Sequence, residues 1–295
     1  MKFHLAAAML TGVSMAQEFT KSPELPRVAS AAVSEGSGLA VSAADPDFLW
    51  AINDSGGTPE IHLIGTDGAD HGKVRLTGAP NTDWEDLAAF TLDGKNYLLV
   101  ADTGDNNAVR KSTTLQILRE PALPAAGKPL AATVLSEWKI EFTYDGGPRD
   151  CESVAVDAAA GKIILVSKRT KPPEIYELPL RPPASKKPVV AVKTGTVLTD
   201  SPLGNLIPFA SQPVGMDISA DHSFAAILTY YGVFVFPRVA NDSWPQTLAK
   251  KPLVLAPHGL PQAESVAISK DGKSIFVLSE GKHQPVVRYQ IAPAG

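Results

Sequence analysis

The chain has 295 residues, of which 44% are hydrophobic and 20% are charged. These proportions are typical of a folded globular protein and exclude an intrinsically disordered chain. With 27 basic and 31 acidic side chains the formal net charge is −4, which disfavours general binding to nucleic acid. The one cysteine, Cys151, excludes an intrachain disulfide and a cysteine-rich metal cluster. The 23 glycines and 25 prolines predict many turns.

Residues 1–16 predict a secretory signal peptide. Lys2 gives a short basic start, an apolar run follows, and Ser14 and Ala16 place small side chains at the positions that determine cleavage. The apolar run is too short to span a bilayer, and no other stretch approaches the roughly 18 apolar residues of a membrane helix. An ordinary N-terminal helix is the alternative interpretation. We expect a periplasmic or extracellular protein with a single domain over residues 17–295.

A short phrase recurs five times along the rest of the chain, each time as an apolar run that ends in a turn. Its copies cover residues 37–41, 85–89, 152–156, 214–218 and 264–268. Successive copies begin 48, 67, 62 and 50 residues apart. A recurrence at such intervals is the sequence signature of a repeat architecture, so each copy is interpreted as the first strand of one structural unit.

Each unit continues with further short β-rich runs that are bounded by turn residues. The second run lies at residues 48–52, 97–100, 163–166, 224–228 and 275–278. The third lies at residues 61–64, 115–118, 175–178, 233–236 and 286–290. A fourth, more polar run can be placed in units one to four, for example at residues 189–197 and 253–256. The sequence has no convincing amphipathic helix pattern, so it predicts an all-β protein.

Four strands per unit and about 50 residues per repeat predict a β-propeller. Five four-stranded blades are the expected number, and six stay open because units two and three are long enough for additional strands. Unit five ends after its third strand, so its outer strand must come from elsewhere. We expect residues 27–33 near the N-terminus to supply this strand and to close the ring, because closure removes exposed sheet edges.

The first strand of each blade lines the central channel of a propeller, so the residues that open these strands converge there. They are Ser37, Glu85, Glu152, Val214 and Glu264, and two positions earlier stand Glu35, Asp83, Asp150, Gln212 and Gln262. Because side chains alternate along a strand, the two residues of each pair point to the same face. Three glutamates around one axis repel one another unless a cation compensates their charge, and oxygen ligands favour Ca²⁺ over Zn²⁺ or Cu²⁺. Strand capping, or pairing with Lys168, Arg169 or Arg149, is the structural alternative.

A second set of polar residues follows the second strand of each unit. It comprises Asp54, Asp102, the pair Lys168 and Arg169, the pair Tyr230 and Tyr231, and Glu280. Strands one and two are antiparallel, so both sets fall on the same rim of the channel. Asp54 and Asp102 are each followed by Ser/Thr and Gly, which is also ordinary turn chemistry. Neighbouring strand positions face opposite ways, so we expect at most one of Lys168 and Arg169 to reach the channel.

The order of Ser and Glu at the channel entrance resembles the five-bladed calcium-activated nucleotidases (apyrases). In that family Ser and Glu residues from the blade entrances hold one Ca²⁺ in the central channel. The resemblance implies a metal role for Ser37, Glu85, Glu152 and Glu264, while Val214 departs from the pattern. Secreted phytase-like and gluconolactonase-like propellers are similar at the level of the fold only.

Two functions from different classes are consistent with these residues. A metal-dependent hydrolase of phosphoesters or lactones would use Asp54 or Asp102 as general base and Lys168 and Arg169 to stabilise negative charge on the substrate. In the alternative, the ion is structural and the rim of a non-catalytic propeller binds a protein or glycan. We expect a monomer that takes a small anionic molecule or a glycan, with no nucleic-acid partner.

Overall fold

The computed structural model describes residues 19–199 and 209–291. Within these ranges the chain forms β-strands and one short helix, α1 (Trp244–Leu248), so the predicted all-β class is confirmed. In the same part of the chain no helix is long and apolar enough to cross a membrane. The predicted signal peptide, residues 1–16, lies outside the described residues.

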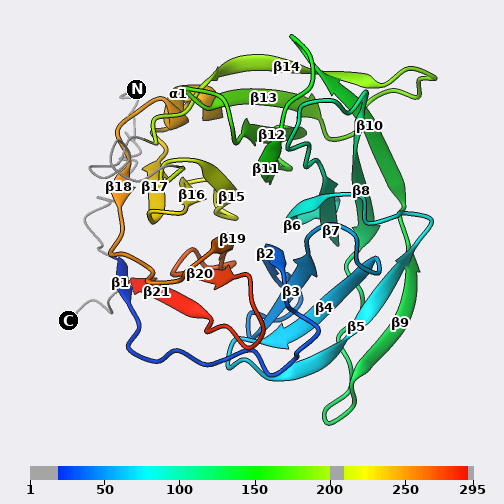
Figure 1. Ribbon diagram of the computed structural model, residues 1–295, viewed down its shortest axis with the longest axis vertical. Coiled ribbons are helices and arrows are strands. Elements are labelled where there is room, and N and C mark those ends of the chain that lie inside the picture. Colours follow the sequence, from blue (N-terminus) through cyan, green and yellow to red (C-terminus); the bar gives the residue numbers. More distant parts are fainter. Residues whose placement is uncertain (1–18, 200–208, 292–295) are drawn as a thin grey trace, which may run out of the picture.

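Five buried strands surround the centre of the molecule, as Figure 1 shows. They are β2 (Gly36–Val41), β6 (Trp84–Leu92), β11 (Cys151–Asp157), β15 (Pro213–Ile218) and β19 (Ala263–Ile268). Each coincides with one copy of the recurring phrase, and each lies beside the preceding and the following inner strand, with β19 next to β2. The repeat interpretation of the sequence is therefore confirmed at the level of the inner strands.

Antiparallel partners extend outward from every inner strand and define five groups. The first group is β2, β3 (Phe48–Asn53), β4 (Glu60–Gly65) and β5 (Asp70–Thr77). The second is β6, β7 (Lys95–Asp102), β8 (Thr113–Arg119) and β10 (Trp138–Tyr144). The third is β11, β12 (Lys162–Ser167), β13 (Glu174–Pro179) and β14 (Val189–Thr196). The fourth is β15, β16 (Phe224–Thr229), β17 (Val233–Pro237) and β18 (Leu253–Val254), and the fifth is β19, β20 (Ser274–Ser279), β21 (Val287–Ile291) and β1 (Phe19–Lys21).

The long second unit holds an additional strand on the outside of the ring. This strand, β9 (Leu130–Leu135), pairs in parallel with β5 of the first group before the chain returns to β10. β10 in turn pairs in parallel with β14 of the third group, which makes one continuous sheet of groups two and three. The extra length therefore extends the outer edge, and no sixth inner strand occurs in the described ranges.

An N-terminal strand completes the fifth group, but it is not the predicted one. β1 pairs antiparallel with β21, and Thr20 lies opposite Gln290. The predicted residues 27–33 instead form a single β-bridge, between Arg27 and Pro285. Val28 and Val33 from this segment are buried in the apolar cluster between the fifth and first groups. The segment was misassigned because its apolar residues fill the seam of the ring as well as they would suit an edge strand.

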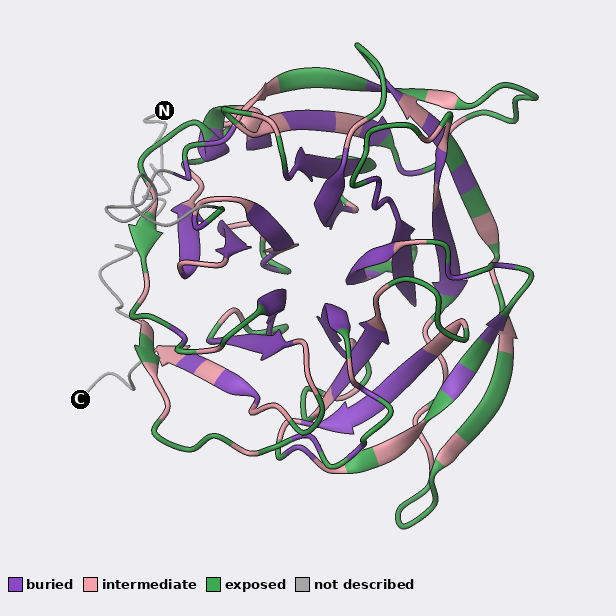
Figure 2. Cartoon of the chain, in the orientation of Figure 1, coloured by how far each residue is buried: buried purple, intermediate pink, exposed green. Residues whose placement is uncertain are grey.

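The core is a ring of five apolar clusters, each of which lies between two neighbouring groups. Figure 2 shows the inner strands as buried and the outermost strands, such as β9 and β14, as largely exposed. Four of the largest fully buried side chains are Trp50, Trp84, Tyr176 and Tyr289. Side-chain packing between neighbouring sheets therefore holds the inner strands in place around the channel.

Candidate metal centre

Every inner strand has a β-bulge at the same position of the repeat. The register shifts lie between Gly36 and Gly38, Trp84 and Asp86, Cys151 and Ser153, Pro213 and Gly215, and Ala263 and Ser265. The extra residues are therefore Ser37, Glu85, Glu152, Val214 and Glu264, the five that the repeat aligns at the channel entrance. A bulge leaves its extra residue out of the ladder and redirects its side chain.

Carboxylates from the second and third groups meet at this entrance. Oxygens of Glu85, Asp150 and Glu152 lie within 4.8 Å of one another, and all three residues are buried. Oxygens of Asp54, Asp83 and Glu85 lie equally close, so Glu85 belongs to both clusters. Asp83 and Asp150 stand two residues before Glu85 and Glu152, and the alternation of strand side chains predicted that each pair would share a face.

Glu152 has one oxygen with a partner and one without. The ammonium group of Lys168 contacts Oε1, and burial raises the pKa of Glu152 to about 8 although Lys168 lowers it. Oε2 is shut off from solvent and accepts no hydrogen bond. Burial and then the charge of Glu152 also raise the pKa of Glu85 well above its usual range. A buried carboxylate oxygen without a donor is unfavourable unless a proton or a cation compensates it.

The first-group side of the entrance is half buried. The carboxyl groups of Asp54 and Asp83 hydrogen-bond each other, and burial raises the pKa of both, that of Asp83 to about 6. Gly104 lies directly against Glu85 and Asp83, where a Cβ atom would collide with both carboxylates. The close approach of this backbone therefore requires glycine.

Glu264 completes the acidic entrance from the fifth group. The hydroxyl of Tyr230 donates to Glu264 Oε1 at 2.5 Å. Glu280 hydrogen-bonds Glu264, and burial followed by this contact raises the pKa of Glu280 to about 8. Glu264 raises the pKa values of Asp54 and Glu152 through its charge, so the acidic residues of the entrance form one electrostatic network.

Two predicted site residues have protein partners of their own. The hydroxyl of Ser37 donates to the carbonyl of Trp84 at 2.7 Å, which ties β2 to β6. Asp102 Oδ1 lies 2.8 Å from a guanidinium nitrogen of Arg110. Arg110 also donates to the carbonyl of Gly104 at 2.8 Å, so it anchors the loop that follows β7. Sequence reasoning missed Arg110, which lies outside the repeated positions.

Both cations of the third group reach the entrance. Lys168 contacts Glu152, and Arg169 Nε donates to Asp150 Oδ2 at 2.6 Å. The expectation that at most one of them would do so was wrong. β12 ends at Ser167, so the two residues follow the strand and strand alternation does not apply to them. Within residues 19–199 and 209–291, no ion pair joins a basic side chain to Glu85, Asp54 or Asp83. The charge of Lys168 lowers the pKa of Glu85, and that of Arg110 lowers the pKa of Asp83, from a greater distance.

Two further carboxylates lie deeper in the ring and have backbone partners. Asp86 accepts hydrogen bonds from the N–H groups of Leu87, Val154 and Met216, at 2.8, 2.7 and 3.2 Å. Asp217 accepts from Ile218 at 2.8 Å and from Ile268 at 2.7 Å. The inner edge of each inner strand has no strand partner, so these carboxylates satisfy N–H groups that would otherwise stay unpaired.

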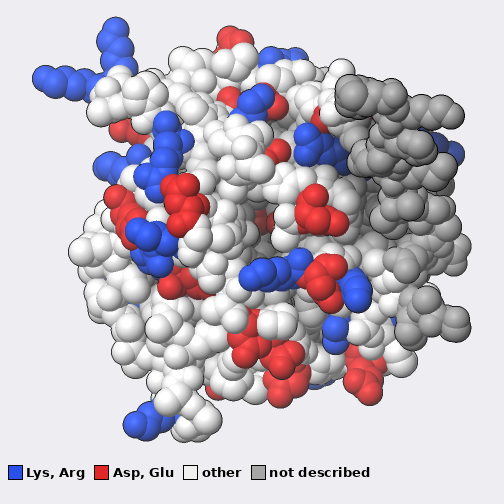
Figure 3. Space-filling view, turned by 180° about the vertical axis from the view of Figure 1, so that it is seen from behind, with Lys and Arg blue, Asp and Glu red and all other residues white. Residues whose placement is uncertain are grey.

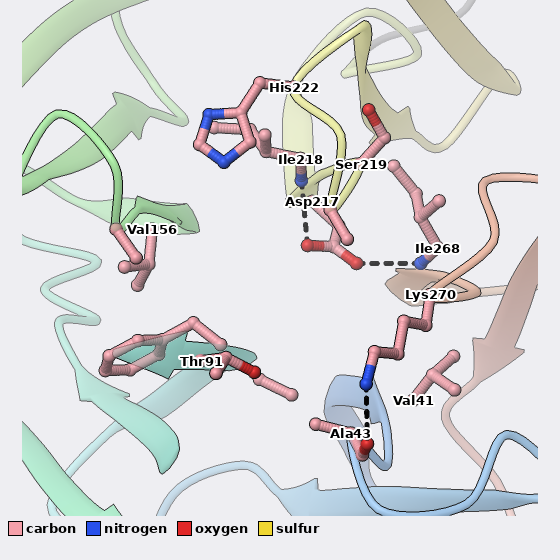
Figure 4. A pocket seen from close by; sticks show the side chains of 14 residues that line it. Val41, Ala43, Thr91, Val156, Asp217, Ile218, Ser219, His222, Ile268 and Lys270 are labelled. Carbon is pink, nitrogen blue, oxygen red and sulfur yellow. Dashed lines mark hydrogen bonds between the residues drawn. The ribbon is translucent and has the colours of Figure 1, made fainter. Parts of the chain in front are cut away.

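The opposite end of the channel holds a small cavity of about 140 Å³, shown in Figure 4. Asp217 points into it, while Lys270 and His222 stand at its margin. Lys270 Nζ donates to the carbonyl of Ala43 at 3.3 Å, and His222 Nδ1 lies 3.1 Å from Asp157 Oδ1. Asp217, Lys270 and His222 have protein partners here, in contrast to Glu152 Oε2 at the entrance.

Charged side chains on the outer surface are mixed in sign. Figure 3 shows one face of the molecule, on which basic and acidic side chains are interspersed. Exposed ion pairs such as Lys73 with Glu60 and Lys162 with Glu177 account for part of this mixture. On this face, therefore, charged side chains of one sign do not gather into one large patch.

No family model matches the chain, and no curated protein matches it. Among solved structures it is similar to the PQQ-bound form of an aldose sugar dehydrogenase from Streptomyces coelicolor, with a TM-score of 0.50 and 10% sequence identity over 92% of this chain and 98% of that chain. These comparisons give no support to the resemblance to calcium-activated nucleotidases or phytase-like proteins. At this identity the likeness concerns the fold alone, and the chain has the fold of a β-propeller.

Proposed function

We propose that the protein binds one hard divalent cation, Ca²⁺, at the channel entrance through Glu85, Asp150 and Glu152. The observation that carries this proposal is the buried, unpartnered Oε2 of Glu152 beside two other carboxylates. Two oxygens that bind the same Ca²⁺ lie at most about 5 Å apart, and those of the three residues lie within 4.8 Å. The bulges are the structural reason that such side chains can meet on one axis.

The donor set favours Ca²⁺ over softer metals. All three residues offer carboxylate oxygens, which suit a hard ion, and the charge of the nearby Glu264 adds to the negative potential that attracts a cation. The raised pKa values of Glu85 and Glu152 mean that the cation would displace protons on binding. Ser37 is left out of the proposed ligand set because its hydroxyl donates to Trp84.

The test compares thermal unfolding in EDTA and after addition of Ca²⁺. A ligand at 100 times its Kd adds about 2.7 kcal/mol to the stability of the folded state, which raises the Tm by several degrees. We expect this rise in the wild type and in the control Glu137→Gln, whose exposed side chain lies 3.9 Å from Arg119 on the outside of the ring. The double variant Glu85→Gln/Glu152→Gln should show no rise.

The double variant is expected to fold. Glutamine has the shape of a protonated glutamate, and burial already favours the protonated form of both side chains. Because Glu152→Gln also removes the partner of the buried Lys168, the Ca²⁺-dependent change in Tm of each protein, and not its absolute Tm, is the quantity compared. An equal Ca²⁺-dependent rise in the double variant would contradict the assignment of the ion to these residues.

The half-buried pair of Asp54 and Asp83 favours a metal-dependent hydrolase over a purely structural ion. A carboxyl group with a pKa of about 6 suits a general acid or base near neutral pH, and this pair lies next to Glu85. Asp102 is left out because it pairs with Arg110. The cation would supply Lewis acidity toward a phosphoryl or lactone oxygen, while Lys168 and Arg169 would bind negative charge on the substrate.

The proposed hydrolase activity is tested with p-nitrophenyl phosphate and glucono-lactone in the presence of Ca²⁺. Hydrolysis should fall at least tenfold in Asp54→Asn, whose Ca²⁺-dependent rise in Tm should persist. The exposed Asp145→Asn serves as the control. Absence of hydrolysis in a wild type that binds Ca²⁺ would favour the structural ion and a propeller that binds a protein or glycan.

Without a cation, the entrance disfavours the quinone PQQ. PQQ carries three carboxylates, whereas the entrance already gathers Glu85, Asp150, Glu152 and Glu264. Lys168 and Arg169 each contact one of these acids. A trianion would therefore meet an excess of negative charge unless a bound cation compensated it.

We further propose that the five groups are the five blades of the propeller and that the mature protein is exported. The five inner strands and five apolar clusters support the first point. The residue pattern of the first 16 residues supports the second. N-terminal sequencing of protein recovered from the culture medium or periplasm tests export, and a start at residue 17 is the expected result.

A further inference from the structure

We propose that a pocket beside the acidic entrance binds a hydroxylated organic anion of the size of one sugar, such as a sugar acid or a sugar phosphate. The pocket has a volume of about 290 Å³. It is lined by Lys168, Arg169, Phe209, Gln212, Tyr230 and Gln262. This volume is near the lower end of small-molecule sites, which suits a single sugar ring.

Phe209 is the first reason to assign a ligand. Its side chain is 62% exposed, and its backbone has φ +68°, a left-handed conformation that is unfavourable for an aromatic residue. Two hydrogen bonds hold the turn, from Gln212 N to Phe209 O at 2.9 Å and from Tyr231 N to the carbonyl of the buried Ala210 at 3.0 Å. The fold therefore maintains a strained backbone that presents an apolar ring to solvent. Packing among residues 19–199 and 209–291 leaves this ring exposed, whereas a ring-shaped ligand would cover it.

The polar side chains of the pocket match a ligand with several hydroxyl groups. Gln212 and Gln262 occupy the positions at which the first three groups have Glu35, Asp83 and Asp150, so this one position of the repeat changes from acidic to neutral in the fourth and fifth groups. An amide offers both donors and an acceptor, as adjacent hydroxyls of a sugar require. Gln212 makes no side-chain hydrogen bond with the part of the chain that the structure describes.

Lys168 connects the pocket to the cation site. Its ammonium group contacts Glu152 Oε1 and lies 5.4 Å from the centre of the Tyr230 ring. Arg169 makes the equivalent contact with Asp150. A cation on Glu152 and Asp150 would take over the compensation of their charge and leave Lys168 and Arg169 available to an anion. The coupling between the two sites, unlike the pocket itself, rests on the proposed Ca²⁺ function.

The test measures binding of glucuronate by isothermal titration calorimetry, in EDTA and with saturating Ca²⁺. Glucose is the neutral probe of similar shape, acetate is an anion without hydroxyls, and glucose 6-phosphate distinguishes a phosphate from a carboxylate. We expect one of the two sugar anions to bind at least tenfold more tightly than glucose and acetate. The affinity should rise at least threefold with Ca²⁺.

Two variants locate the ligand. Phe209→Ala and Gln212→Ala should each weaken the preferred sugar anion at least fivefold while the Ca²⁺-dependent rise in Tm is unchanged. The control is Val239→Ala, another exposed apolar residue, which lies outside the pocket. Sugar-anion binding with no effect of Ca²⁺ on either Tm or affinity would retain the pocket and reject the cation site. Equal binding of all probes, no binding, or binding that is insensitive to Phe209→Ala and Gln212→Ala would overturn the pocket.

Discussion

Glu85 and Asp86 are neighbours in β6 and both are buried, yet their carboxyl groups have opposite surroundings. Asp86 accepts three backbone N–H groups from β6, β11 and β15. Glu85 meets other carboxylates instead, and their charge adds to the effect of burial on its pKa. Burial alone therefore does not identify a binding site. The two residues differ in the number of hydrogen-bond donors that face their carboxyl oxygens. The donors to Asp86 give it a structural role, and their absence among the contacts described for Glu85 is a reason to propose Glu85 as a metal ligand.

Removal of the Asp86 carboxylate should give the largest effect. Asp86→Ala leaves the N–H groups of Val154 and Met216 buried without an acceptor, each at about 1–3 kcal/mol. We expect the free energy of unfolding in urea to fall by about 3–5 kcal/mol. Asp145→Ala, in an exposed turn, should change it by less than about 0.5 kcal/mol. A change of less than about 0.5 kcal/mol in Asp86→Ala as well would contradict the structural role of the Asp86 carboxylate, on which its contrast with Glu85 rests.

The pH dependence of stability should separate the entrance from the rest of the channel. The folded protein in EDTA raises the pKa of Glu152 from 4.5 to about 8, so it holds a proton that the unfolded chain has released. This contribution to stability is complete below pH 4.5 and is lost as the pH rises through about 8.

We therefore expect the Tm in EDTA to fall by several degrees between pH 5 and pH 9, and to fall less with Ca²⁺, which binds the ionised groups. Thermal unfolding across this range is the measurement. The double variant Glu85→Gln/Glu152→Gln should have a shallower slope in EDTA, because two of the carboxyl groups with raised pKa values no longer titrate. Parallel slopes in the wild type and the double variant would place the titrating groups elsewhere.

Gly104→Ala should give a smaller and more local effect. The added Cβ would collide with the carboxylates of Glu85 and Asp83 and push them apart. We expect the affinity for Ca²⁺, measured by calorimetry, to fall about tenfold, which corresponds to about 1.4 kcal/mol. Gly127→Ala is a control at an exposed turn where nothing lies within 4 Å of the added atom. This control should leave the affinity for Ca²⁺ unchanged. An unchanged affinity in Gly104→Ala would contradict the proposal that Glu85 binds the cation.

The sequence was most informative where the repeat is strict. The five inner strands and the alignment of Glu85, Glu152 and Glu264 could be predicted, because one phrase carries both the strand and its opening residue. The bulge that redirects these side chains could not, since the sequence alone shows no register shift. The contact between Arg110 and Asp102 and the role of Asp86 were also missed, because both depend on partners from other parts of the chain.

The outer edge of the ring was predicted less well for a related reason. Residues 27–33 and β9 are short amphipathic segments whose place depends on which edge is free. β9 joins the first group in parallel, a pairing between units that a repeat does not encode. Local pattern therefore indicates a strand, while the geometry of the closed ring decides its partner.

The parallel pairings of the outer strands also make the hydrogen bonding between neighbouring groups unequal around the ring. β10 and β14 join the second and third groups into one sheet, and β9 attaches the second unit to the first group. Neither the fourth group, β15–β18, nor the fifth shares a strand pairing with a neighbouring group in the described ranges, and both are held to their neighbours by side chains and loops. Amide hydrogen exchange should therefore be fastest in these two groups. Opening between them would widen the side of the entrance where Gln212 and Tyr230 lie, and leave the carboxylates of Glu85 and Glu152 in place.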